Sequence, residues 1–469
     1  MEDNLPDSQT SKEKVEESTP VNGEDTESLS SSLSNLKISV SSNIFDKLQD
    51  SNDNKTEELR QKIIQRLSLT HPNLQPIEHK FWDTQLVSKL DEVVTTNDCG
   101  PINPNQRVED VRKDPYPLPS GFEWVMLDIT NEEERTQVYT LLNENYVEDG
   151  DSLFRFDYKP EFLLWALTTP NYKKEWQIGV RVTSSKLLVG YITAIPVTIN
   201  IMGKNLKAAE VNFLCIHKKL RTKRLAPVLI KEITRRVNLC GIWQAVYTAG
   251  IVIPKPIASC RYWHRPLDIK KLIAARFSGV GKRMTISRAV RIYKVNEVEN
   301  NEMRPMEKKD VSSLYKLLKD HLNAFKLYQV FTQDEVHHLF LPQEGIIHTY
   351  VKSVNGESGR IKPHSGNVTD MCSFYSLPSS VINNPKVDKI RAAYSFYNVA
   401  GTMTYKRLME HALFFAKQKE YDVFNSLDLM QNRHVFEDLK FGMGDGDLHY
   451  YMFNYRVPLV RGKRIIDFS

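Results

Sequence analysis

The sequence lacks long hydrophobic runs, a secretory leader and any clustered cysteines. No apolar run approaches the ~20 residues of a membrane-spanning helix. The N-terminus, MEDNLPDSQT, has neither the basic start nor the apolar stretch of a signal peptide. The five cysteines are scattered without a CxxC pair, so we expect no disulfide framework, no zinc and no other metal site. These absences favour a protein without a transmembrane segment in a reducing compartment such as the cytoplasm.

The N-terminal region is also poor in aromatic residues. Residues 1–55 are rich in Ser, Glu, Asp and Asn and contain one aromatic side chain, Phe45. They cannot bury enough apolar surface to offset chain entropy, so we expect this acidic, Ser-rich region to be disordered. Residues 1–60 carry a net charge of −8, and the remainder therefore carries +13 of the total +5. A basic body suits an anionic ligand, which could be a nucleotide cofactor, nucleic acid or a membrane surface, but no recognition motif supports a nucleic-acid partner.

Beyond residues 1–55 the chain has the composition of a globular protein. Its 469 residues are 41% hydrophobic, with 20 Phe and 20 Tyr, which is enough for two or three domains. A short helix is expected at 57–67. Apolar spacing then predicts helices at 132–143, 160–167, 311–324 and 408–419, and strands at 176–182, 186–197, 242–253, 369–377 and 392–398. This order predicts an α/β fold with a mixed sheet, arranged in two similar halves.

The stretch EVNFLCIHKKLRTKRLAP, residues 210–227, combines a strand, a basic turn and a helix start. Alternation places Val211, Phe213 and Cys215 on one strand face, and Asn212, Leu214 and Ile216 on the other. Pro227 suits the first turn of a helix. A cationic turn before a helix N-terminus predicts a phosphate site, because free backbone amides and the helix dipole attract anions. The alternative is a solvated charged loop.

Several long motifs occur in a fixed order. They are HKFWDTQ (79–85), LNENYVEDGDSLFRFDY (142–158), EVNFLCIHK (210–218), TAGIVIPKPIASCRYWHRPL (248–267), YDVFNSLDL (421–429) and KFGMGDG (440–446). In these motifs the chain resembles the eukaryotic N-myristoyltransferases (glycylpeptide N-tetradecanoyltransferases). The resemblance implies two GNAT-type, acetyltransferase-like halves related by pseudo-two-fold symmetry, with mixed β-sheets flanked by helices. Residues 76–295 would bind acyl-CoA, and residues 296–469 would bind peptide and supply a C-terminal carboxylate.

The resemblance also implies an activity and its partners. Myristate would pass from myristoyl-CoA, the acyl-donor cosubstrate, to the α-amine of an N-terminal glycine on a peptide or nascent protein, by direct attack on the thioester. No prosthetic group is implied, and a monomer is expected. Two other functions stay open: an N-acetyltransferase that uses a shorter acyl-CoA, and a non-catalytic module that binds acyl-CoA or peptide. Cavity depth separates the first of these from myristoyl transfer.

The resemblance assigns the thioester and CoA contacts. The backbone amides of Phe213 and Leu214 would form the oxyanion hole, which requires a break in the strand ladder; the alternative is ordinary buried strand. Lys80, Phe81 and Trp82 would pack on the adenine end, or else anchor the N-terminal segment. The implied CoA-binding residues are Lys80, Phe81, Trp82, Phe213, Leu214, Cys215, Ile216, Arg221, Thr222, Arg224, Leu225 and Ala226.

The implied base is unusual, since it is the C-terminal α-carboxylate of Ser469. Such a carboxylate, with a pKa of roughly 3.3–3.7, is a weak base in water, and burial would raise that pKa. The ending RIIDFS is less apolar than the endings of the family, because Asp467 adds a second carboxylate. The mechanism requires only the backbone carboxylate.

Peptide recognition is assigned in the same way. Asp445 would attract a basic residue of the peptide, and the acidic loop Glu148, Asp149 and Asp151 would act as a lid. The alternatives are core aromatics and a solvated acidic loop. His217 is expected to be structural. The implied substrate-binding residues are Tyr146, Phe154, Phe156, Asn212, Tyr247, Thr248, Tyr262, His264, Phe277, Asp445, Gly446 and Leu448.

Overall fold

Helices and strands alternate along the chain in the computed structural model. It describes residues 81–89, 92–149, 152–253, 255–279, 281, 284–299, 301–354 and 367–460, which belong to one compact unit spanning His79–Ser469. The predictions for residues 1–55 and 57–67 lie outside the described residues. The helices are α3 (Glu132–Asn145), α4 (Pro160–Leu167), α5 (Leu225–Leu239), α6 (Ile269–Ala274), α7 (Ile286–Ile292), α8 (Val311–Leu322), α9 (Gln333–Phe340) and α10 (Tyr405–Gln418).

The strands form one large and one small sheet. They are β1 (Phe122–Met126), β2 (Phe154–Phe156), β3 (Ile178–Val182), β4 (Leu188–Ile201), β5 (Lys204–Ile216), β6 (Ala245–Ala249), β7 (Ala258–Pro266), β8 (Arg304–Pro305), β9 (Leu327–Gln329), β10 (Ile347–Val354), β11 (Asn367–Ser376), β12 (Ser379–Val381), β13 (Lys389–Ile390), β14 (Ala392–Ala400), β15 (Val423–Leu427) and β16 (Gly442–Phe453). The large sheet has 13 strands in the order β1-β3-β4-β5-β6-β16-β7-β15-β14-β11-β10-β8, with β9 paired to β4. The small sheet has the order β13-β12-β2.

The strand order repeats about the centre of the large sheet. In the first half, β4 pairs with β5, α5 follows β5, and β5 runs parallel to β6. In the second half, β11 pairs with β14, α10 follows β14, and β14 runs parallel to β15. The predicted mixed α/β fold with two similar halves is therefore confirmed. The division at residue 295/296 stays a prediction.

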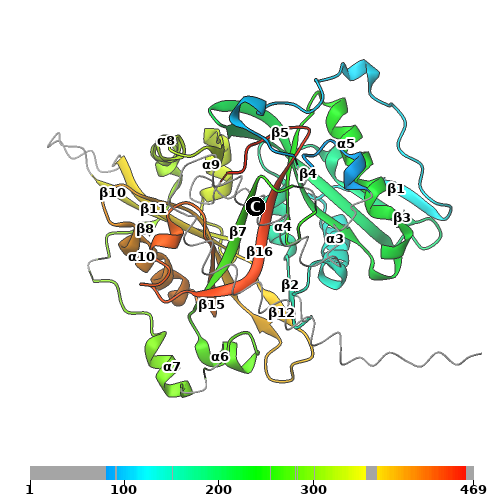
Figure 1. Ribbon diagram of the computed structural model, residues 1–469. Helices are drawn as coiled ribbons and strands as arrows, with labels where there is room; N and C mark the ends of the chain where they lie inside the picture. The colour runs from blue at the N-terminus through cyan, green and yellow to red at the C-terminus, as the bar shows by residue number, and fades with distance from the viewer. Residues whose placement is uncertain are drawn as a thin grey trace, which may run out of the picture. The chain divides into compact units, whose positions relative to one another are not determined.

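The two halves exchange strands at the centre. β7 pairs with β15 and β16 pairs with β6, so each central strand lies beside a strand from the other part of the sequence. Figure 1 shows β7 and β16 side by side, with α3 and α5 to one side and α8, α9 and α10 to the other. Each parallel pair is short, with two residue pairs between β5 and β6 and three between β14 and β15. Beyond these pairs the strands diverge, which leaves room for a ligand between β5 and β6.

Helices cover both faces of each half. The α5 helix presents Leu225, Leu229, Ile233 and Val237 at spacings of four residues, which is the buried stripe of an amphipathic helix. Three of these residues belong to the cluster on one face of β4 and β5, while α3 and α4 belong to the cluster on the other face. In the second half α10 packs in one cluster, and α8 and α9 share the cluster of α3 and α4. The largest core cluster is thus common to both halves.

Most predicted elements are confirmed. The helices predicted at 132–143, 160–167, 311–324 and 408–419 correspond to α3, α4, α8 and α10. The strand predicted over 242–253 is wrong in length, because β6 covers Ala245–Ala249 alone, where the chain pairs with β5 and β16.

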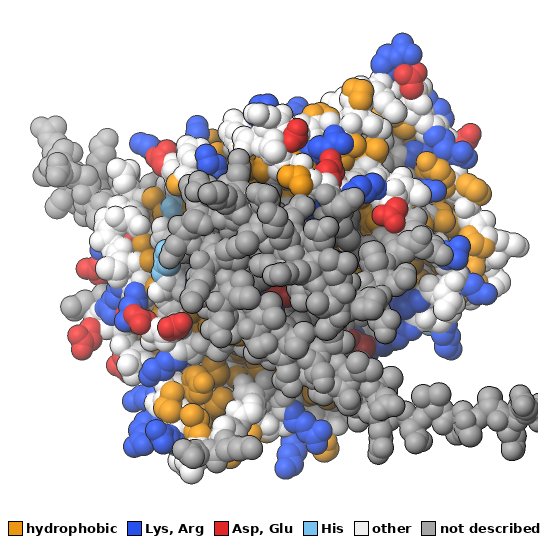
Figure 2. Space-filling view, viewed as in Figure 1, with side chains coloured by type: hydrophobic (Ala, Val, Ile, Leu, Met, Phe, Trp, Pro, Cys, Tyr) orange, Lys and Arg blue, Asp and Glu red, His pale blue; other side chains and the backbone are white. Residues whose placement is uncertain are grey.

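No helix within the described ranges is both long and apolar enough to cross a membrane. Figure 2 shows Lys and Arg side chains on several sides of the visible face, mixed with Asp and Glu.

Candidate active site

The strand β5 is interrupted by a bulge at Phe213. Where β5 supplies two residues, Phe213 and Leu214, the partner strand β4 supplies one, Ile192. Phe213 has a positive φ of 54°, which is costly for a residue with a side chain by about 1–3 kcal/mol. A bulge of this kind re-aims the side chains and amides that follow it. The ladder break that an oxyanion hole requires is therefore present at Phe213.

The bulge changes which residues share a strand face. Val211 and Leu214 pack with the cluster under α5, whereas Phe213 and Cys215 belong to the cluster shared by the two halves. The prediction that Val211 lies on one face with Phe213 and Cys215 is wrong, because the extra residue reverses the alternation after Asn212. Asn212 and Phe213 consequently both line the same cavity.

The backbone of Phe213 lies near the hydroxyl of Tyr146, a residue that also lines the cavity, and this interaction partly offsets the effect of burial on the pKa of Tyr146. Burial raises the pKa of Tyr146 well above its ordinary value, so the hydroxyl stays neutral. The ring of Phe213 packs edge-on against Tyr158, with ring centroids 5.0 Å apart. The bulge thus lies among aromatic side chains at the cavity wall.

The cavity has a volume of about 820 Å³ and is lined by residues from both halves. That volume lies in the upper part of the ~300–1,000 Å³ range of small-molecule sites. Tyr247 does not line it: its ring stacks between those of Trp82 and Tyr451, at centroid distances of 5.3 and 5.2 Å. The predicted substrate residues that do line the cavity are Tyr146, Phe154, Phe156, Asn212, Thr248, Tyr262, His264, Phe277, Asp445, Gly446 and Leu448.

His264 is held tightly at the cavity wall. Its Nδ1 lies 2.7 Å from Oδ1 of Asn425 on β15, so Nδ1 carries the donated hydrogen and Nε2 is left as an acceptor. Burial lowers the pKa of His264, which favours the neutral imidazole. The ring also packs edge-on against Phe277, at 5.3 Å between centroids. Gly444 lies against the other side, where an added Cβ would sit 2.4 Å from Nε2.

Sequence reasoning missed several residues that line the cavity. They are Tyr158, Trp165, Glu210, Tyr375, Tyr394 and Asn425. Some of the missed aromatics come from β11 and β14 in the second half, whose strands read as ordinary buried sheet. Tyr375 and Tyr394 lie in none of the quoted motifs, and their place in the cavity wall depends on the packing of β11 and β14.

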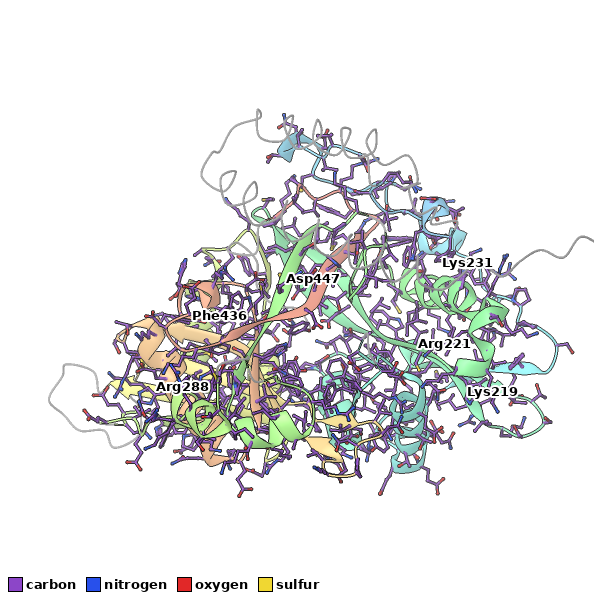
Figure 3. All side chains as sticks on the ribbon, turned by 60° about the horizontal axis from the view of Figure 1, so that its bottom comes forward. Lys219, Arg221, Lys231, Arg288, Phe436 and Asp447 are labelled. Carbon is purple, nitrogen blue, oxygen red and sulfur yellow. The ribbon has the colours of Figure 1, made fainter. Side chains whose placement is uncertain are left out.

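The basic turn is a separate feature at the start of α5. Lys218–Lys223 form a 3-10 helix, and Arg224, in left-handed conformation with φ 56°, precedes the first residue of α5. Asn145 holds the turn: its Oδ1 accepts from the Lys218 N–H at 3.0 Å, and its carbonyl oxygen accepts from Arg221 at 2.7 Å. Residues 221–224 are exposed. Figure 3 shows Lys219 and Arg221 near one another, well apart from Asp447 on the central strands.

One acidic residue ties the predicted lid loop to this turn. Oε1 of Glu148 accepts from Arg155 and from Lys218, both at 2.5 Å. The hydrogen bond from Lys218, together with that from Arg155, lowers the pKa of Glu148 to about 2. Asp149 lines the cavity, and Asp151 lies outside the described residues. Glu148 is thus paired with two cations of its own chain, and the lid role of the loop stays a prediction.

The remaining predicted residues fall into three groups. Phe81 and Trp82 pack edge-on at 5.3 Å, and the Trp82 stack on Tyr247 is the packing that the anchoring alternative predicts. Leu225 is buried in α5. Lys80 and Ser469 lie outside the described residues, so their roles stay predictions. Across the described ranges no three His, Cys, Asp or Glu side chains are placed to hold a metal ion.

Comparisons with known proteins agree over most of the chain. The family model "Myristoyl-CoA:protein N-myristoyltransferase, N-terminal domain" matches residues 101–260, and the model of the corresponding C-terminal domain matches residues 274–465. Glycylpeptide N-tetradecanoyltransferase from Drosophila melanogaster is 48% identical over 409 residues, covering 87% of this chain and 84% of that protein. The protein of that name from Plasmodium falciparum is 50% identical over 381 residues, covering 81% and 90%. The crystal structure of Saccharomyces cerevisiae N-myristoyltransferase with bound myristoyl-CoA has 41% identity and a TM-score of 0.77, covering 82% of this chain and 94% of that one.

Proposed function

Because the chain belongs to the myristoyl-CoA:protein N-myristoyltransferase family, we propose that its cavity brings the thioester of myristoyl-CoA together with the N-terminal glycine of a peptide or nascent protein. The reaction transfers the myristoyl group from the CoA sulfur to the α-amine of that glycine. The observation that carries this proposal is the bulge at Phe213 in the wall of a cavity of about 820 Å³. A two-carbon acetyl group would leave most of that space unfilled.

The Phe213 and Leu214 amides stabilise the thioester oxygen as it becomes anionic. Backbone N–H groups that are already in place need little reorganisation in the transition state, so such donors contribute strongly to acyl transfer. The amine nitrogen attacks the carbonyl carbon, a tetrahedral intermediate forms, and the carbon–sulfur bond breaks to release CoA. The amine proton passes to a base, for which we retain the α-carboxylate of Ser469.

The basic turn holds the phosphates of CoA. Four of its cations, Lys219, Arg221, Lys223 and Arg224, have no carboxylate within 4.0 Å in the described part of the chain. We expect the double variant Lys219→Gln/Arg221→Gln to raise the Kd of myristoyl-CoA at least about 10-fold, because each charge-assisted hydrogen bond contributes roughly 1.5–3 kcal/mol. Titration calorimetry with myristoyl-CoA measures this change.

The matched control for that variant is Lys231→Gln. Lys231 is an exposed cation within α5, past the turn along the chain, and Figure 3 labels it together with Lys219 and Arg221. The Lys231→Gln variant should leave the Kd within about twofold, because Lys231 is not part of the turn and an exposed charge is screened by salt. Equal weakening by both variants would mean that general charge, and not the turn, attracts CoA.

Glycine selectivity gives the direct test of the activity. A peptide that begins with Gly should accept labelled myristate from myristoyl-CoA, while the same peptide beginning with Ala should accept less than about 1% as much. The reason is that a β-carbon next to the attacking amine disturbs an alignment in which a shift of 1 Å costs about 10²-fold in rate. Equal labelling of both peptides, or of neither, would contradict the proposal.

Two alternatives make different predictions in the same assay. An N-acetyltransferase would use acetyl-CoA at least as well as myristoyl-CoA, and a binding module would bind both ligands without turnover. We further propose that the enzyme acts as a monomer in the cytoplasm, where nascent chains with N-terminal glycine are available.

A further inference from the structure

Glu210 is a buried carboxylate beside the reacting centre that the reaction has not yet used. It is 8% exposed, lines the cavity, and lies three residues before the Phe213 bulge. It occupies the last paired position of β5 with β6, opposite Val246, before those strands diverge. A buried carboxylate is costly unless it is hydrogen-bonded, so its place at this point of the cavity wall needs a reason.

The side chain of Glu210 fixes the direction of the Asn212 amide. Nδ2 of Asn212 donates to Oε1 of Glu210 at 2.6 Å. The donor of this hydrogen bond is the NH₂ group of Asn212, so that group faces Glu210. The two polar ends of an amide point in different directions, and Oδ1 of Asn212 is therefore turned away from Glu210.

The substrate amine must come close to Asn212. In a reactive complex the attacking nitrogen lies about 3–3.5 Å from the thioester carbon. The oxygen on that carbon is assigned to the Phe213 amide, which follows Asn212 directly. Thr248 faces the same cavity from β6. Asn212 is thus a wall residue at the place where the amine attacks.

An attacking amine needs acceptors around it. Its lone pair points at the carbonyl carbon, and its N–H bonds point toward the wall. The side-chain oxygen of Asn accepts a hydrogen bond from such an N–H. The side-chain NH₂ group of Asn is a donor and cannot accept one. We propose that Glu210 is a positioning residue, which holds Oδ1 of Asn212 toward the glycine amine and so makes the site selective for substrates with a free amine. This inference rests on the proposed function.

The variant Glu210→Gln tests the orientation with little change in size. The side-chain amide that it introduces can donate to Oδ1 of Asn212, which allows the Asn212 amide to turn over and present its NH₂ group to the substrate. We expect the affinity for a Gly-peptide to fall about 10-fold. The loss should be confined to ligands that carry the amine.

The experiment compares two peptides in the presence of a thioether analogue of myristoyl-CoA that cannot react. One peptide begins with Gly, and the other carries an acetyl group in place of that glycine, so that it lacks only the amine. Glu210→Gln and Asn212→Ala should each lower the affinity for the Gly-peptide and leave the affinity for the acetyl-peptide within about twofold of wild type. Because Glu210 acts through Asn212, the double variant should lose no more affinity for the Gly-peptide than Asn212→Ala loses alone.

Glu335 supplies a matched control. It is also 8% exposed and lines the same cavity, but its Oε2 accepts from the Thr332 N–H at 2.6 Å and caps its own helix. Glu335→Gln should leave the difference in affinity between the two peptides unchanged. If Glu210→Gln does not fold, Glu210→Asp moves the same acceptor back by one methylene, and it should also weaken the Gly-peptide selectively.

Three results would overturn the inference: equal weakening of both peptides by Glu210→Gln, additive losses in the double variant, or the same loss of amine selectivity in Glu335→Gln. Failure of the wild-type protein to bind either peptide, or to label the Gly-peptide with native myristoyl-CoA, would instead overturn the proposed function itself, and this inference with it.

Discussion

Replacing Asp370 by alanine is expected to lower the free energy of unfolding by at least about 3 kcal/mol. Asp370 is fully buried, and its Oδ1 accepts from the backbone N–H groups of Gly401, Thr402 and Met403 at 2.9, 2.9 and 3.0 Å. Its Oδ2 accepts from the hydroxyls of Thr369 and Thr402 at 2.7 and 2.5 Å. Alanine removes the acceptor of all these donors, and each hydrogen bond to a charged group contributes about 1.5–3 kcal/mol. Urea unfolding of the two proteins measures the difference.

This loss should depend on pH in a defined direction. Burial alone would raise the pKa of Asp370, but the hydrogen bonds from Thr402 and Thr369 hold it below its ordinary value. A group whose pKa is lowered on folding stabilises the protein above its unfolded pKa of ~3.9, and that stabilisation disappears as the pH falls through the folded pKa. The gap between wild type and Asp370→Ala should therefore be full at pH 7 and shrink below pH ~3.9.

Asp438→Ala is the control for this prediction. Asp438 is a carboxylate whose side chain is 61% exposed and pairs with Lys406 at 2.9 Å. An exposed pair contributes about 0–1 kcal/mol, so this variant should unfold close to wild type. If the two variants unfold alike, the amides around Asp370 are satisfied by water once the carboxylate is gone.

The position of Asp370 explains why one half binds CoA in our proposal. Gly401–Met403 connect β14 to α10, as the basic turn connects β5 to α5 in the first half. In the second half the backbone N–H groups before α10 donate to the carboxylate of Asp370. In the first half the corresponding turn is exposed and cationic. Repetition of the fold thus does not repeat the anion site.

Replacing Gly444 by alanine should lower kcat/KM for Gly-peptides about 10²-fold. The added Cβ would lie 2.4 Å from Nε2 of His264 and 2.9 Å from the carbonyl oxygen of Tyr262. His264 cannot yield freely, because Asn425 holds its Nδ1 at 2.7 Å. The ring or the Gly444 segment must therefore move, and a shift of about 1 Å in a positioned group costs about this much in rate. Steady-state kinetics with a Gly-peptide measures the change.

Gly442→Ala separates this effect from a general loss of glycine in the same strand. An added Cβ there meets its nearest neighbour, the carbonyl oxygen of His264, at 3.9 Å, which is ordinary contact. This variant should keep kcat/KM within about twofold. Thermal unfolding of both variants shows whether Gly444→Ala acts on the site or on the fold: we expect similar midpoints and different kinetics.

The sequence by itself determined most of the elements, the motifs and the cationic character of the turn before α5. Local patterns suffice for these features, because helix and strand preferences depend on spacing within a few turns. The stripe of α5 and the helix at Pro160–Leu167 are examples. The family motifs likewise pointed to residues that line one cavity, although they come from segments far apart in the chain.

Only the tertiary structure decided how these residues face one another. The bulge at Phe213 depends on the register of β5 against β4, and simple alternation cannot reveal one extra residue. The bond between His264 and Asn425 joins residues 161 positions apart. Glu210 reads as one more strand residue, and its place in the cavity wall depends on where the pairing of β5 with β6 ends. Local spacing sets each element, whereas pairing between distant segments sets the site.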